Sequence, residues 1–299
     1  MHPLISSTQM RAAEAHTIAS GISAQTLVQR AGAAVAHHIR SHFAQCHRVL
    51  ICVGPGNNGA DGIVVACELA RHGYSPTLFV WRRHADAWLQ QATDMAIPIY
   101  HATDDHALTT LIRDTDVVVD ALLGIGANRP LADDLLAYVH AINHRPVTVP
   151  CVAVDVPTGC YGDGEVTSPV MVHADMTYAT GPRKLATCFM PGLAAAGVVH
   201  ACDIGLVSQS PLTCHEATAD VAASWLPARP LDSYKGTFGT LCVWAGSAAY
   251  PGAATLCCHA ALRAGTGIVS LATTQSLAPL LWRMPEPVSY THLTLPTIL

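Results

Sequence analysis

Residues 49–73, VLICVGPGNNGADGIVVACELARHG, constrain the possible folds of this chain most strongly. The apolar run at 48–53 is typical of a buried strand, and residues 63–71 have the apolar spacing of a helix that Gly73 would end. A glycine-rich turn joins the two. Such a turn presents free backbone N–H groups and the positive end of a helix dipole to a bound anion. The segment therefore predicts an α/β unit with a ligand site at the turn.

The glycines of this turn have the G-x-G-x-x-G spacing of a dinucleotide fingerprint, but the other residues differ from it. Pro55 removes one backbone donor, and three polar residues stand where the fingerprint has small ones: Asn57, Asn58 and Asp61. The acidic residue expected about 20 positions later is missing, because the apolar run at 77–81 ends in two arginines. An ordinary NAD-dependent Rossmann oxidoreductase is thus only an alternative. A P-loop NTPase is disfavoured, because no G-K-[ST] ending follows.

Apolar runs and helical stretches alternate along the first two thirds of the chain. Two leading helices are expected at 8–20 and 23–42, and strands at 48–53, 77–81, 117–121 and 149–154, with further strands near 174–179 and 198–203. This alternation is typical of a parallel sheet with helices on both faces. A second α/β unit is expected beyond a polar stretch at 208–219, with strands at 240–245 and 268–272 around a helix at 252–264.

The composition excludes several classes of protein. A net charge of −5 and a pI near 6.4 provide no basic field, so no nucleic-acid partner is expected. No apolar run reaches the length of a membrane span and no basic-then-apolar leader begins the chain, which predicts a cytoplasmic protein without a membrane partner. The 11 cysteines include no C-x-x-C pair and are expected to be reduced thiols in the core.

Three expected strands end in polar loops that contain glycine: GPGNNGAD, DALLGIGANRP and DVPTGCYGDGE. Asp120 and Asp155 each end an apolar run, so both carboxylates are expected at the carboxyl edge of the sheet, where ligands of such sheets bind. Either aspartate could instead cap the following loop. Oxygen ligands suit a hard cation, which Asn58, Asp120 and Thr158 could hold together. Arg129 and the backbone donors would remain for a pyrophosphate, and Asp155 for proton transfer.

These loops belong to six motifs that occur in order over residues 7–207: TLVQRAGAAVA, VGPGNNGADGIVVACELARHG, VVVDALLGIGANRP, VAVDVPTGCYGDGE, ADMTYATGPRKLA and GVVHACDIGL. Through them the chain resembles the NAD(P)H-hydrate epimerase family, the YjeF N-terminal type. The resemblance implies a Rossmann-like three-layer α/β/α sandwich with a mostly parallel sheet. It also implies an isomerase of cofactor repair, which interconverts the R and S hydrates of NADH and NADPH at carbon 6 of the nicotinamide ring.

The resemblance also implies roles for individual residues. The hydrated cofactor would contact Asn57, Asn58, Gly59, Ala60, Asp61, Gly124, Ile125, Gly126, Ala127, Asn128, Arg129, Pro130 and Asp155, and a potassium ion would be held by Asn58, Asp120 and Thr158. Asp155 is the expected acid/base, with Lys184, one of only two lysines, as a second candidate. Ala60 and Thr158 depart from the glycine and serine usual there, and Thr158 keeps the hydroxyl. A non-catalytic nucleotide-binding or interaction module with the same fold is the other alternative.

The second unit resembles a different enzyme. Residues 231–273 resemble the opening of the ribokinase-like NAD(P)H-hydrate dehydratase, but the later GxGD-type loop is absent from this sequence. ADP or ATP would serve only a complete dehydratase domain, so this lyase activity is not expected. The expected division is an epimerase domain at 1–210, an incomplete dehydratase fragment at 211–287 and a non-native tail at 288–299. A bacterial source and a possible homo-oligomer complete the expectations.

Overall fold

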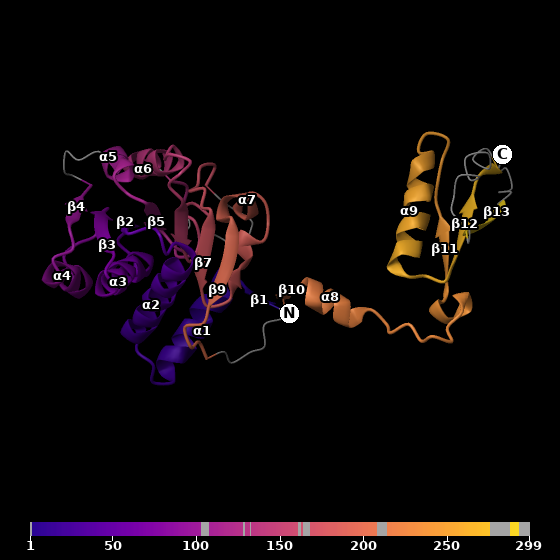
Figure 1. Cartoon of the computed structure of the whole chain (residues 1–299), viewed down its shortest axis with the longest axis horizontal. Helices are drawn as coiled ribbons and strands as arrows, with labels where there is room; N and C mark the ends of the chain where they lie inside the picture. The colour runs from indigo at the N-terminus through magenta and orange to yellow at the C-terminus, as the bar shows by residue number, and fades with distance from the viewer. Residues whose placement is uncertain are drawn as a thin grey trace. The chain divides into compact units, whose positions relative to one another are not determined.

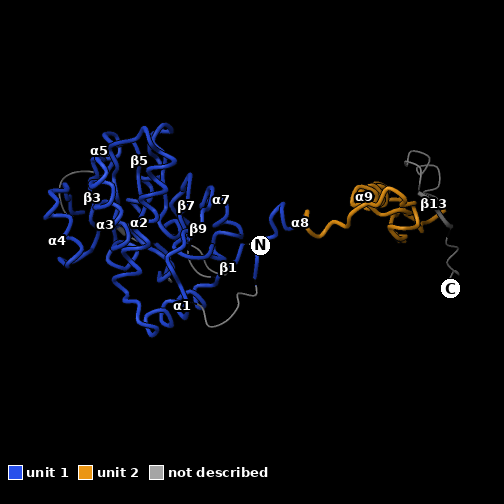
Figure 2. The backbone as a smooth tube through the Cα atoms, turned by 60° about the horizontal axis from the view of Figure 1, so that its bottom comes forward, with its two compact units in different colours: residues 1–222 blue, residues 223–299 orange. Residues whose placement is uncertain are grey.

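The computed structural model describes residues 2–102, 108–127, 129–131, 133–160, 163, 168–207, 214–275 and 288–292. Two compact units divide the chain, residues 1–222 and 223–299 (Figure 2). The division expected from the sequence, with limits at 210 and 287, stays a prediction.

The first unit is built on a seven-stranded parallel sheet (Figure 1). Its strands are β2 (Arg48–Val53), β3 (Ser75–Val80), β4 (Ile99–His101), β5 (Val117–Ala121), β6 (Cys151–Val154), β7 (Met176–Thr180) and β9 (Val198–Cys202). They lie in the order β4-β3-β2-β5-β6-β7-β9, and every neighbouring pair is parallel. The chain order reverses between β2 and β5, which is the point where open α/β sheets bind ligands.

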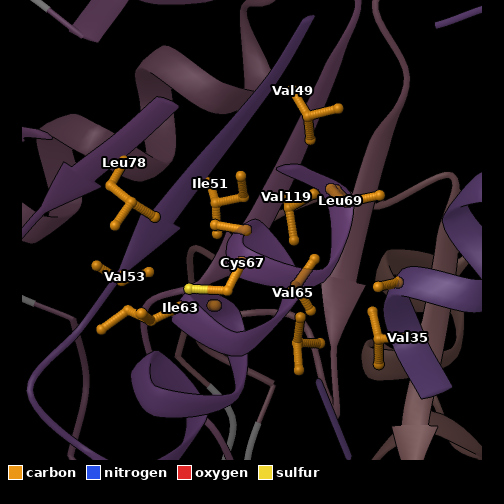
Figure 3. Close-up of a cluster of buried hydrophobic side chains, with 14 of the residues drawn as sticks. Val35, Val49, Ile51, Val53, Ile63, Val65, Cys67, Leu69, Leu78 and Val119 are labelled. Carbon is orange, nitrogen blue, oxygen red and sulfur yellow. The ribbon is translucent and has the colours of Figure 1, made fainter. Parts of the chain in front are cut away.

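Helices cover both faces of this sheet. They are α1 (Ser7–Ala19), α2 (Ala24–His42), α3 (Asn57–Arg71), α4 (Ala87–Asp94), α5 (Leu108–Arg113), α6 (Asp133–Asn143) and α7 (Gly192–Ala196). The 3-10 turn η1 (Leu185–Thr187) precedes α7 in the chain. Along β2, Val49, Ile51 and Val53 pack against α2, α3 and α4 (Figure 3), whereas Leu50 and Cys52 pack against α5 and α6 on the other face. This alternation confirms the three-layer Rossmann-like fold.

The helix after β2 begins earlier than the sequence pattern predicts. Its first residue is Asn57 rather than Ile63, and Gly56 occupies the N-cap without a side-chain hydrogen bond. The polar residues of the turn therefore lie in the first turn of α3. Asparagine and glycine are weak helix formers, and tertiary packing overrides that preference here, because α3 is buried along most of its length.

A small second sheet in the first unit was not predicted. It has the order β10-β1-β8 and consists of β1 (His2–Ile5), β8 (Arg183–Lys184) and β10 (Cys214–Glu216). Arg183 forms an ion pair of 3.1 Å with Glu216 across it. Strands of two to four residues from distant parts of the chain leave no periodic pattern, because pairing rather than local preference creates them.

A cluster of histidines packs around Tyr178 where α2 lies against β7 and the edge strand β9. His38 stacks on the Tyr178 ring at 5.1 Å between centroids, and the Nδ1 atom of His42 lies 2.8 Å from the Tyr178 hydroxyl. The ring of His200, on β9, is 5.1 Å from that of His42. Burial lowers the pKa of His38 and of His200, and the neighbouring imidazoles lower both further.

This cluster should make stability depend on pH. A histidine with a lowered folded-state pKa is stabilising above its unfolded pKa of about 6.5, and that contribution is lost as pH falls through the folded value. We expect the double substitution His38→Gln and His200→Gln to reduce, by a few degrees, the drop in Tm between pH 7.5 and pH 5.5. His173→Gln, at an exposed position, is the control. An equal drop in all three proteins would contradict this assignment.

The second unit is also α/β. It contains η2 (Lys235–Phe238), β11 (Thr240–Trp244), α9 (Pro251–Ala264), β12 (Ile268–Thr273) and β13 (Val288–His292), and its three strands form a parallel sheet. Its small core gathers Ala254, Cys258, Ala261, Val269 and Leu271. The short helix α8 (Ala219–Trp225) spans the division between the two units. The ribokinase-like assignment and the non-native tail stay predictions. In the described part of the whole chain, no helix is both long and apolar enough to span a membrane.

Candidate functional site

Three adjacent strands, β2, β5 and β6, bring the three polar loops to one edge of the sheet. Asp120 is the penultimate residue of β5, and Asp155 directly follows β6. The loop after β2 leads into α3, whose first turn carries Asn57, Asn58 and Asp61. The residues that the sequence predicts for the site thus start from neighbouring positions in the fold.

Backbone contacts hold the first two loops against each other. A Cβ atom on Gly54 would lie 1.8 Å from the carbonyl oxygen of Leu122, and one on Gly59 would lie 2.0 Å from the carbonyl oxygen of Gly54. Both distances are far below van der Waals contact. Glycine is therefore required at both positions by the close approach of the turn, the start of α3 and the loop after β5.

Asp120 and Thr158 form a buried polar pair, and neither side chain is exposed. The Thr158 amide donates to Asp120 Oδ2 at 2.7 Å, and the Thr158 hydroxyl donates to Oδ1 at the same distance. The Leu123 amide donates to the Thr158 hydroxyl at 3.0 Å, which ties the second loop to the third. Burial raises the pKa of Asp120 to about 6, although the hydrogen bonds from Thr158 act in the opposite direction.

Asn58 supplies an unsatisfied amide against the loop after β5, the loop that Thr158 also contacts. It is 9% exposed, and neither its oxygen nor its nitrogen has a hydrogen-bond partner. A Cβ atom on Gly124, in the loop after β5, would lie 3.3 Å from Asn58 Cβ. Buried polar groups are rarely left unpaired, so an unpartnered amide together with a buried carboxylate and hydroxyl fits a site for a hard cation. Among the described residues, no three histidine, cysteine or acidic side chains are grouped to hold a metal ion.

Asp155 is held in a strained and crowded position. Its φ angle is +69°, a region that non-glycine residues seldom adopt and that is often found at functional sites. The Thr180 hydroxyl donates to Asp155 Oδ1 at 2.7 Å, and the Lys184 ammonium forms an ion pair with the same oxygen. Lys184 is 1% exposed and also donates to the Thr180 carbonyl at 2.5 Å. The structure therefore brings the two predicted acid/base candidates together.

A small cavity lies next to this ion pair. It measures 60 Å³ and is lined by the polar residues Glu14, Asn57, Asp61 and Thr180 and by apolar residues of α1, α2 and Ile204. Asp61 is 8% exposed, and burial holds the pKa of its carboxyl well above the usual range, with Asp155 and Glu14 raising it further. The volume admits a few water molecules, so only the reacting end of a larger ligand would be enclosed.

The other described residues predicted to contact the cofactor do not line the cavity. Ala60 is buried in α3, and Ile125 packs on the apolar cluster of Leu27, Ala31 and Ile204 beside the cavity. Ala127 packs on the opposite face of the sheet, and three further residues are in part or wholly exposed and do not line the cavity: Gly126, Arg129 and Pro130. Asn128 lies outside the described residues.

Comparison with known proteins identifies the family. The model of the YjeF-related protein N-terminus matches residues 24–186, more than half of the chain. The chain belongs to this family. The matched range runs from the start of α2 to the turn that follows Lys184, so it contains the three strand-end loops.

Relatives in the YjeF family are of two lengths. A Limosilactobacillus fermentum protein named NAD(P)H-hydrate epimerase is 33% identical over 67% of this chain and 97% of its own length. Proteins named bifunctional NAD(P)H-hydrate repair enzyme are longer. The one from Thermofilum pendens is 32% identical over 90% of this chain and 52% of its own length, and the one from Mycobacterium tuberculosis is 35% identical over 94% and 57%. This chain spans about half the length of these longer relatives.

A crystal structure of a yeast protein has the same fold as the first unit of this chain. It is 22% identical in sequence, with a TM-score of 0.59 over 66% of this chain and 86% of the yeast chain. At this identity the likeness supports the Rossmann-like architecture alone.

Sequence reasoning missed two residues that line the cavity, Glu14 and Thr180. Glu14 stands on α1 in a stretch of alternating polar and small residues that is typical of a solvated helix face. Thr180 ends β7, one strand further along the sheet than the three loops considered. The rule that ligands bind at the carboxyl ends of parallel strands could have found Thr180.

Proposed function

We propose that this chain catalyses the interconversion of the R and S hydrates of NADH and NADPH, as part of cofactor repair. One observation carries the proposal: the ends of β2, β5 and β6 bring a buried amide and two buried carboxylates to one edge of the sheet, where the buried ammonium of Lys184, from β8, pairs with Asp155. Relatives named as epimerases and as bifunctional repair enzymes support the same reaction. The dehydratase step is outside the proposal, because the chain spans only about half the length of the bifunctional relatives.

Asp155 is the proposed acid/base of the reaction. Inversion at carbon 6 requires either loss and return of water or opening and closure of the ring, and each route needs proton transfer near that carbon. Lys184 holds the Asp155 carboxylate through Oδ1, and Thr180 donates to the same atom, which fixes its orientation. We propose that the hydrated ring enters at Asn57 and Asp61 and that the loop after β5 contacts the rest of the dinucleotide.

Potassium is the proposed resident cation, held by Asn58, Asp120 and Thr158. When bound, it would supply positive charge that neutralises Asp120 and satisfies the oxygen of Asn58. The oxygen-rich, partly unsatisfied donor set supports this choice. A bacterial, cytoplasmic protein that forms a homo-oligomer stays a prediction from the sequence.

Potassium should therefore stabilise the chain. A carboxyl with a raised folded-state pKa is stabilising below its unfolded pKa of about 4, and this contribution is lost as pH rises through about 6. A cation that binds ionised Asp120 reverses the loss. At pH 7.5 and ten times the dissociation constant, KCl should add about 1.4 kcal/mol to the free energy of unfolding, measured by thermal melting. Tetramethylammonium chloride at the same ionic strength is the control, and an equal effect of both salts would contradict the site.

A coupled assay tests the proposed function. The chain is incubated with the R-hydrate of NADH and an excess of a separate S-specific dehydratase, so that each inversion is followed by formation of NADH. We expect R-hydrate to disappear faster than it does by spontaneous epimerisation, in proportion to the amount of chain. Consumption at the spontaneous rate at every chain concentration would refute the epimerase assignment.

A further inference from the structure

Two carboxyl groups line the 60 Å³ cavity directly, and neither is Asp155. Glu14 and Asp61 are both lining residues, whereas Asp155 lies behind them as the acceptor of a hydrogen bond from the lining residue Thr180, whose hydroxyl donates to it at 2.7 Å. The acid/base assigned from sequence is thus bonded to a lining residue, whereas a second acidic pair lines the cavity itself.

The acidic pair at the wall has no local partner. Within the described part of the chain, the carboxyl groups of Glu14 and Asp61 have neither a hydrogen bond nor an ion pair, although Asp61 is only 8% exposed. The single buried ammonium nearby, that of Lys184, pairs with Asp155. Burial raises the pKa of Glu14 and of Asp61, and Asp155 raises both further. A buried carboxyl that lines a cavity without a partner points to a ligand that would supply the partner.

The position of Glu14 is fixed by the structure around α1. Ser6 caps the helix in a capping box with Gln9, and the Ser7 amide donates to Asp163, in the loop after β6, at 2.6 Å. At the other end, the Val207 amide donates to the Thr17 hydroxyl at 2.9 Å. Both ends of α1 are thus bound to other parts of the first unit, which holds Glu14 at the cavity wall.

We propose that Glu14 is a second catalytic acid/base residue of the hydrate site and acts with Asp61 on the face of the nicotinamide ring opposite to Asp155. The inference rests on the proposed function and deepens it. It assigns one protonatable group to each face of the ring that undergoes inversion.

The chemistry explains why two faces need two groups. The ring nitrogen lone pair expels the hydroxyl at carbon 6, which takes a proton from the acid on its own face and leaves as water. The resulting C=N⁺ carbon is attacked by a water molecule from the opposite face, and that water gives its proton to the carboxylate there. One carbon–oxygen bond breaks, one forms, and a proton moves from one carboxyl to the other, so nothing is oxidised or reduced. A group on one face alone returns water to that same face.

Oxygen isotope exchange separates these steps. Wild-type chain, Glu14→Gln and the control Glu68→Gln, which is half-buried on α3 and ion-paired with Arg71, are incubated separately with the R-hydrate and the S-hydrate of NADH in H₂¹⁸O. The epimers are then separated by chromatography, and the ¹⁸O content of each is measured by mass spectrometry. In the wild type, each inverted molecule should carry one solvent oxygen. In Glu14→Gln, inversion should fall about 100-fold in both directions, whereas exchange with retention should persist in the epimer, R or S, whose hydroxyl lies on the Asp155 face. Glu68→Gln should behave as wild type.

Each outcome has a distinct meaning. A wild-type chain that does not accelerate inversion at all would refute the proposed function itself. Inversion without uptake of solvent oxygen would refute the two-face inference and favour ring opening. An unchanged inversion rate in Glu14→Gln, or an equal fall in inversion and exchange, would also overturn it. Asp61→Asn in the same assay provides a second test should Glu14→Gln fail to fold, with the same expected separation of inversion from exchange.

Discussion

Replacement of Asp155 by Asn should lower the rate of R-to-S inversion by about 100-fold or more, the usual contribution of a positioned acid/base group. Asn keeps the size of the side chain but can neither release nor accept a proton at neutral pH. It also leaves the Lys184 ammonium without its carboxylate partner, since the ion pair with Asp155 Oδ1 is lost. The measurement is the initial rate of conversion of R-hydrate by purified protein, with the dehydratase in excess.

Two controls separate chemistry from folding in this experiment. Asp116→Asn removes a carboxylate at the opposite end of the same sheet, where it pairs with Arg48 at 2.7 Å. Asp116 also accepts from the His47 and Arg48 amides, and Asn keeps part of these hydrogen bonds, so the rate should stay within about twofold of wild type although stability falls by about 1–2 kcal/mol. Thermal melting of Asp155→Asn then shows whether the protein remains folded. A folded Asp155→Asn variant with wild-type rate would move the acid/base role to another residue.

Replacement of Gly59 by Ala should cost about 3 kcal/mol or more of unfolding free energy, or prevent folding. The added Cβ atom would lie 2.0 Å from the Gly54 carbonyl oxygen, and the turn cannot move away freely because Gly54 itself lies against Leu122. Backbone atoms on both sides leave no flexible side chain to yield. Denaturant unfolding of the purified protein measures the change.

Gly56→Ala is the matched control for this substitution. It lies in the same turn, its φ angle is −91°, and a Cβ atom there would meet nothing within 4 Å. We expect a cost below about 1 kcal/mol, since Gly56 caps α3 through its backbone alone. Similar costs for Gly56→Ala and Gly59→Ala would show that the close approach between the loops does not limit stability.

The parts of the fold that follow from periodicity could be predicted from the sequence. The apolar runs at 48–53 and 117–121 coincide with β2 and β5, because both strands are buried on two faces and leave continuous apolar segments. The positions of Asp120 and Asp155 follow from the same argument, since parallel strands end at one edge. The first turn of α3 could not be predicted, because Asn57 and Asn58 are weak helix formers that the surrounding core holds in place.

The site was predictable only where it coincides with a strand end. Glu14 was missed because its contacts with the cavity come from the packing of α1 and leave no mark in the spacing of its neighbours. The contact roles of Arg129 and Pro130 rest on the family resemblance and stay predictions, because both residues are exposed and neither lines the cavity. Periodicity thus located the edge of the sheet, whereas the packing of distant segments completed the site.

The most direct test of the central claim starts from each pure epimer separately. R-hydrate and S-hydrate of NADH are incubated with the chain, without any dehydratase, and the mixture is resolved by chromatography over time. We expect both solutions to reach the same ratio of R to S that they reach spontaneously, but sooner in proportion to the amount of chain. A catalyst of inversion must speed both directions equally. Equilibration at the uncatalysed rate from either side would contradict the claim that this edge of the sheet is an epimerase site.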